Sequence, residues 1–336
     1  MVKPFRTAAL LAAATLVVAA GCGSDDDSSG GGGGGDVSAG TPKGFEASTG
    51  YLSKVVDASK HQPYRFEMRT SAAGKTGEGA SDGERSEVVM DFGKILGPAL
   101  GVSPDKLQDR LGVDDLSLEI VTDASKVYLH APLYDALGEL VPAGSMGPME
   151  DMIDAFDGIG DGWAVVDQKQ LMAEVPGAAA SQSVGAMDPA SYFKLLGISE
   201  DVDELGLDEI DGVSVTGLKA EVTMGDIYAA QGIDVDKMIP GGAHGIDKAL
   251  VPIEVWVDKD NHIRRVELTT GGEPLKEALE DAGEDPDDFG PLVDNELTNT
   301  IEITDYGDTS IEVDVPSDDL TDITDDFIDV MQQIGT

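Results

Sequence analysis

Cysteine is nearly absent from this 336-residue sequence, which contains only Cys22. A single thiol cannot form an intramolecular disulfide, a zinc–thiolate cluster or a CxxC redox pair, so we expect the fold to be held by packing alone. Aromatic residues are also scarce, at 5%, whereas glycines number 42. A chain of this length and composition fits one large domain with long loops.

Basic residues are few as well. Lysine and arginine together number 22 against 65 aspartates and glutamates, which gives a formal net charge of -43. Such a charge repels polyphosphates and anionic lipid surfaces, so nucleic acid is not an expected partner. Otherwise the charge indicates a soluble extracellular or salt-adapted protein and points to no particular site.

Catalytic and metal-binding motifs are lacking. There is no GxSxG elbow, no P-loop and no GxGxxG after a strand, and the histidines have no HxxxH or HExxH spacing. The acidic runs Asp201–Glu204 and Asp258–Asn261 superficially suggest calcium ligands, but neither continues into a complete EF-hand loop. We expect both runs to be solvated turns. The sequence therefore predicts a protein that is not an enzyme and holds no metal or cofactor.

The N-terminus carries the pattern of a secretory signal. Lys3 and Arg6 precede an apolar run, Ala8–Ala20, that is too short to span a bilayer comfortably and ends in small residues before Cys22. This arrangement resembles the bacterial lipobox, in which the leader is cut and the cysteine is acylated, for example with palmitate. We expect residues 1–21 to be a lipoprotein signal peptide and Cys22 to be the lipidation site. The alternative is an ordinary signal peptide with an incidental cysteine.

Residues 22–44 are mainly glycine, serine and aspartate, with too little apolar surface to fold. They are expected to form a flexible tether between the lipid anchor and a single domain, residues 45–336, that ends in an amphipathic helix. The anchor would hold this domain outside the cytoplasm, on the outer face of the cell membrane.

Strands dominate the domain. The clearest signal is Pro252–Thr270, where apolar and polar residues alternate on both sides of the turn Lys259–Asn261, as in a β-hairpin with one apolar face. Similar alternation predicts a hairpin of 64–69 with 88–92 around a Gly-rich loop at 72–83, a hairpin of 116–121 with 127–130, a strand at 163–166, a long strand at 213–222 with a bulge or bend near Gly217, and a final hairpin of 301–303 with 311–315.

Helical spacing occurs between these strands. It predicts helices at about 45–60, 103–111, within 133–162, from 188 to 196, within the acidic segment 274–297 and from Pro316 to the C-terminus, with a small-residue loop at 172–186. The strands form antiparallel hairpins without regular βαβ alternation, so the fold class is α+β.

Five features occur in an order that resembles a known group. They are Trp163 leading a strand, Asp188–Pro189 opening a helix, Ile210–Val213 opening a long strand, Val255–Asp258, and Ile263–Arg265. With the lipobox-like leader, this order resembles the LppX/LprAFG group of actinobacterial lipoproteins over roughly Tyr51–Pro316. The resemblance implies a LolA-like fold, a curved antiparallel β half-barrel whose concave face is covered by helices. It also implies an apolar cavity for lipid acyl chains and an envelope transporter as a candidate partner.

Alternating apolar residues would line such a cavity, and flexible methionines suit variable acyl chains. The predicted lining residues are Phe66, Met68, Val88, Met90, Leu118, Ile120, Val127, Leu129, Tyr192, Leu195, Val255, Val257, Val266 and Leu268. Two other hypotheses remain open. The same residues could form a dry core in an anchored interaction or sensor protein, and an extracellular hydrolase would lack a recognisable nucleophile constellation.

Overall fold

The computed structural model describes residues 42, 45, 47–59, 62–95, 103–113, 116–123, 125–132, 156, 159–160, 162–175, 199, 202–230, 245–286, 293 and 296–335. The predicted signal peptide, Cys22 and almost all of the tether lie outside these residues, as do the predicted helix at 188–196 and most of 133–162. Tyr192 and Leu195 fall there too.

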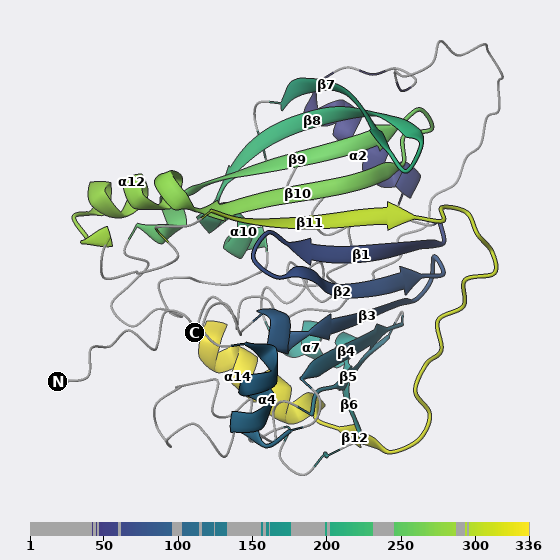
Figure 1. Cartoon of the computed structure of the whole chain (residues 1–336). Coiled ribbons are helices and arrows are strands. Elements are labelled where there is room, and N and C mark those ends of the chain that lie inside the picture. The colour runs from purple at the N-terminus through teal and green to yellow at the C-terminus, as the bar shows by residue number, and fades with distance from the viewer. Residues whose placement is uncertain are drawn as a thin grey trace.

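One large sheet organises the described part of the chain (Figure 1). Its twelve strands follow the spatial order β12-β6-β5-β4-β3-β2-β1-β11-β10-β9-β8-β7, and β12 and β7 are its two ends, so the sheet is open. Every neighbouring pair is antiparallel except β12 with β6. The strands are β1 (Tyr64–Thr70), β2 (Gly74–Ser81), β3 (Ser86–Asp91), β4 (Ser117–Thr122), β5 (Lys126–His130), β6 (Trp163–Asp167), β7 (Val202–Ile210), β8 (Val213–Thr223), β9 (Leu250–Asp258), β10 (Ile263–Gly271), β11 (Glu296–Thr304) and β12 (Leu320–Asp322).

The helices are α2 (Thr49–Ser59), α4 (Pro104–Leu111), α7 (Gln168–Glu174), α10 (Met224–Ala230), the 3-10 helix η1 (Ile246–Lys248), α12 (Gly272–Ala282) and α14 (Thr324–Gly335). α2 packs on β10 and α10 on β8, whereas α7 and α14 pack on the other half of the sheet, against β6. The predicted α+β class, with a curved, mainly antiparallel open sheet and helices beside it, is therefore confirmed (Figure 1).

The alternation along each strand gives the sheet two different faces. We call the inner face the one that carries Phe66, Val88 and Val255, because these residues form one buried cluster with Leu52 of α2 and Phe327 of α14. The residues between them point to the opposite, outer face, which is largely charged. The core thus lies between the inner face and the helices.

Several predicted elements are confirmed. The hairpins β9–β10 and β4–β5, strand β6, and helices α2 and α4 lie where the periodicity placed them. α4 begins after Ser103 with proline at its first turn, and it ends at Gly112, whose φ of 69° places it in the left-handed region that glycine tolerates.

The Gly-rich loop predicted at 72–83 is wrong. Residues 74–81 form β2, which lies between β1 and β3, so these two strands are not neighbours. Glycine has low strand propensity, and the prediction followed that rule. The structure shows why glycine is used here, since side chains from β1 occupy the space over Gly77 and Gly79.

The predicted final hairpin and the helix start at Pro316 are also wrong. Ile311 and Val313 are buried, but they belong to an irregular segment that we call the strap, residues 305–319, which runs from β11 to β12 past the strand ends (Figure 1). Val313 packs on the outer face against Val121, Tyr128 and Val165. The alternation therefore reflects burial without a strand partner, and α14 begins later, at Thr324.

Three further elements differ from the sequence prediction. The acidic run at 201–204 was expected to be a turn, but residues 202–204 open the edge strand β7. A bulge or bend was expected near Gly217; the bulge lies in the paired strand β7, between Glu204 and Gly206, directly opposite Leu218 and Gly217, while β8 pairs regularly with β9. Helix α7 extends into the start of the predicted loop at 172–186. By contrast, the helix predicted within the acidic segment 274–297 is confirmed by α12, and the segment ends at the start of β11.

Candidate functional site

The inner face is the candidate site, because it gathers the apolar residues that the sequence singled out. Twelve of the fourteen predicted lining residues are described, and all twelve belong to or pack against the single inner-face cluster. All of them are buried except Leu129, which is partly buried. They come from β1, β3, β4, β5, β9 and β10, so the cluster crosses most of the sheet.

Sequence reasoning missed other members of the same cluster. Ile253 and Ile263 lie in the hairpin that was predicted, and Ile301 and Leu218 come from its neighbours β11 and β8. Ile253 could have been found, because it shares the alternation of Val255. Ile263 lies three residues before Val266, because a bulge at Arg264 adds one residue to the strand. This odd spacing breaks the period-two alternation, so the sequence pattern did not place Ile263 on the inner face.

Helices close the inner face from one side. Tyr51, Leu52 and Val55 place one face of α2 in the cluster, and Phe327 and Val330 do the same for α14. The opposite side of α2 is exposed at Lys54 and Asp57. These helices are thus amphipathic covers, held mainly by apolar burial.

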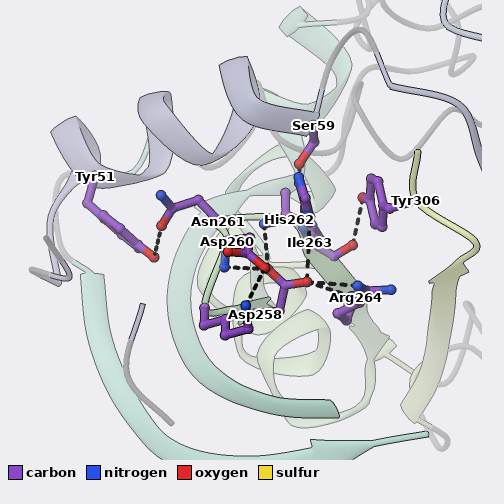
Figure 2. A network of polar contacts seen from close by, with 10 residues as sticks. Tyr51, Ser59, Asp258, Asp260, Asn261, His262, Ile263, Arg264 and Tyr306 are labelled. Carbon is purple, nitrogen blue, oxygen red and sulfur yellow. Dashed lines mark hydrogen bonds and ion pairs between the residues drawn. The ribbon is translucent and has the colours of Figure 1, made fainter. Parts of the chain in front are cut away.

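A polar network lies where the β9–β10 turn meets α2 (Figure 2). Its centre is Asp258, whose side chain is almost completely buried. Oδ1 of Asp258 accepts hydrogen bonds from the backbone N–H groups of Asp260 (2.9 Å) and His262 (3.0 Å). Oδ2 accepts from Nε and Nη2 of Arg264, at 2.9 and 2.8 Å. Asp258 is therefore not the solvated turn residue that the sequence suggested.

This environment keeps Asp258 ionised. Burial by itself raises the pKa of the carboxyl group, but the hydrogen bonds from His262 and Asp260 and the charge of Arg264 outweigh it and hold the pKa at about 2. Burial, together with the negative charge of Asp258, raises the pKa of the Tyr51 hydroxyl. The network is thus a charged, fully hydrogen-bonded structural centre rather than a proton donor.

The network joins three distant segments. Figure 2 shows Tyr51 and Ser59, from the two ends of α2, directed at the turn. Tyr51 donates to Oδ1 of Asn261 (2.9 Å), and the N–H of Ile263 donates to Oγ of Ser59 (3.4 Å). At the start of the strap, Tyr306 donates to the carbonyl oxygen of Ile263 (2.7 Å).

The Tyr306 ring contacts side chains of the β9–β10 hairpin and of β1, where the Tyr64 ring lies 5.5 Å away between centroids. The Tyr306 ring stacks on His262, with ring centroids 4.7 Å apart, and the guanidinium of Arg264 lies 5.0 Å from its centroid. The described residues contain no group of three or more His, Cys, Asp or Glu side chains arranged to hold a metal ion. Among the described helices, none has both the length and the apolar character needed to cross a bilayer.

Comparisons with known proteins find structural likeness only. No protein-family profile and no curated protein sequence match the chain. The lipoprotein LppX of Mycobacterium tuberculosis is 11% identical, with a TM-score of 0.37 over 80% of this chain and 97% of LppX. LprF of Mycobacterium bovis is 9% identical, with a TM-score of 0.36 over 83% of this chain and 99% of LprF. Both names fall in the group that the sequence resembles.

Proposed function

We propose that this chain is a membrane-anchored extracytoplasmic lipoprotein that binds or transfers lipid in an apolar interior between the curved sheet and its helices. Acyl chains would leave a membrane leaflet for this interior, and each CH2 group removed from water would contribute about 0.8 kcal/mol. No covalent step is needed. An envelope transporter is the partner that would deliver or accept the lipid.

One observation carries this proposal. The inner face presents a single apolar cluster across both halves of the sheet, and the helices that cover it pack on different strands, α2 on β10, α10 on β8, and α7 with α14 on β6. Because these helices pack on different strands, one of them can move away from the inner face while the sheet stays folded. The lipobox-like sequence before Cys22 supports a location beside a membrane.

A second function is favoured by the burial itself. Eleven of the predicted lining residues are exposed by no more than 6%. Burial of this extent is what a core filled by the protein's own side chains also gives. An anchored interaction or sensor protein with an acidic surface is therefore the competing proposal.

Lipid extraction separates the two. The Cys22→Ala chain, purified without detergent from a lipid-containing host, should yield near one lipid per chain in an organic extract analysed by mass spectrometry. It should also take up a fluorescent fatty acid. A clean extract together with no uptake would rule out the carrier and leave the interaction protein.

A photoreactive fatty acid locates the binding surface. Cross-linking followed by peptide mapping should mark inner-face residues such as Met90 and Val255. Labelling confined to exposed positions such as Val89 or Leu207 would mean that the fatty acid adheres to the surface instead.

A further inference from the structure

Two glycines interrupt the inner face at the middle of the sheet. In the register of β1 with β2, Gly79 lies directly opposite Phe66 and Gly77 directly opposite Met68. On the other side of β2, Val88 is paired with Gly79 and Met90 with Gly77. Strand β2 therefore contributes no side chain at two successive inner positions between strands that contribute bulky ones.

The neighbouring side chains occupy the space that the glycines leave. A Cβ atom at Gly79 would overlap the tip of the Phe66 ring, and one at Gly77 would lie 2.5 Å from Cε of Met68. Phe66 and Met68 thus lie across β2, along the sheet, instead of standing upright from β1. A side chain that lies along a sheet takes up less of the depth of the interior than an upright one.

A similar pair of an aromatic side chain and a cross-strand glycine lies on the outer face. Gly217 of β8 is directly opposite Trp256 of β9, and a Cβ atom at Gly217 would lie 2.5 Å from Cζ3 of the indole ring. An aromatic ring again lies flat over a glycine, but here it is separated from the interior by the sheet. This pair provides an internal control for the pairs on β2.

We propose that the Phe66–Gly79 and Met68–Gly77 pairs set the length of acyl chain that the interior accepts. This inference rests on the proposed lipid-binding function. Glycine at 77 and 79 lets both side chains lie flat, and any Cβ there lifts the ring or the thioether into the interior. Phe66, Met68 and the two glycines are then specificity-determining residues for the acyl chain.

Affinity for saturated fatty acids of increasing length, from decanoic to stearic acid, tests this assignment. Gly79→Ala and Gly77→Ala should shift the preference toward shorter chains, with affinity falling about fourfold for each CH2 group excluded from the interior. Phe66→Leu should shift it toward longer chains. Because an added Cβ also approaches carbonyl oxygens of β3, the glycine variants could fail to fold, and Phe66→Leu alone then decides.

Gly217→Ala and Trp256→Leu are the matched controls, since they disturb an equivalent pair on the outer face and should leave the length preference unchanged. Equal length profiles for the wild-type chain and Phe66→Leu would overturn the inference while leaving lipid binding intact. The same length shift in the Trp256→Leu control would also overturn it. A wild-type chain that takes up no fatty acid would overturn the proposed function and this inference with it.

Discussion

At the scale of single residues, Asp258 is a buried and ionised carboxylate. Removing a carboxylate from water is costly unless hydrogen bonds and an opposite charge compensate it. Here two backbone N–H groups and two guanidinium N–H groups supply that compensation. All four donor groups come from residues 259–264, which form the β9–β10 turn and the start of β10. The carboxylate therefore fixes the turn that receives α2.

The low pKa of Asp258 predicts an acid-dependent loss of stability. A folded pKa of about 2 against an ordinary 3.8 means that the contribution is fully present above about pH 4 and is lost as the pH falls toward 2. Its size is about 2 kcal/mol of the free energy of unfolding. Denaturant titrations of the wild-type chain and Asp258→Asn from pH 7 to pH 2 should show a difference that shrinks by this amount below pH 4.

Asp260→Asn is the control for this measurement, because Asp260 lies on the same turn but its carboxylate is exposed and forms a surface ion pair with Lys259. It should change stability by less than about 0.5 kcal/mol at any pH. A constant difference between the wild-type chain and Asp258→Asn down to pH 2 would contradict the assigned charge state.

At the scale of elements, the strap holds the sheet together from the outside. Near its start, the N–H of Gly307 donates to the carbonyl oxygen of Pro63 (2.8 Å). Further along, the carbonyl oxygen of Val313 accepts from Nη1 of Arg85 (3.3 Å), and the carbonyl oxygen of Asp319 accepts from the N–H of Trp163 (2.9 Å). Its first anchor is Tyr306, which joins it to β10. The strap thus contacts segments from both halves of the sheet.

Replacing Tyr306 should separate two contributions to this anchor. Tyr306→Phe removes the hydrogen bond to Ile263 but keeps the ring contacts with His262 and Arg264, so we expect a loss of about 1 kcal/mol in the free energy of unfolding. Tyr306→Leu removes the ring contacts as well and should cost about 1 kcal/mol more. Chemical denaturation at neutral pH measures both.

Tyr128→Phe serves as the comparison, because the Tyr128 hydroxyl donates to Oδ2 of Asp123 over a long distance of 3.5 Å. Its loss should be smaller than that of Tyr306→Phe. Equal effects of the two Tyr→Phe substitutions would show that the contact with Ile263 contributes no more than a marginal hydrogen bond.

The strap also shows where sequence-based prediction ends. The hairpin β9–β10 was predictable because local alternation, turn residues and burial all agree there. In the strap the same alternation arises because Ile311 and Val313 are buried although the segment pairs with no strand. A pattern of buried residues does not indicate whether they pack as part of a β-ladder or as an irregular segment. In β2 and β7 the tertiary pairing overrides the low strand propensity of glycine and of acidic residues.

The candidate site was predictable in part for the same reason. Period-two alternation gives the face of each strand, so the twelve described lining residues share one face as expected. It does not give the neighbour of a strand or the direction in which a side chain lies. The placement of Phe66 over Gly79 depends on the pairing of β1 with β2, which no local pattern specifies.

At the scale of the whole molecule, charge and anchor act in opposite directions. A net charge of -43 keeps the body away from an anionic membrane surface, whereas a lipid on Cys22 would hold it there. The segment 22–44 reconciles the two if it is a flexible coil, whose mean span is roughly 25 Å. Bending of such a coil would let the domain meet the membrane surface.

Cys22→Ala tests this arrangement directly. Without the thiol no acyl chain can be attached, and the acidic body has no affinity of its own for anionic lipid, so the variant should pass from the membrane fraction to the medium. Fractionation with immunoblotting measures the shift, and Cys22→Ala should fold as the wild-type chain does, because the residue precedes the domain. A variant that stays membrane-bound after a high-salt wash would show that something other than Cys22 is the anchor.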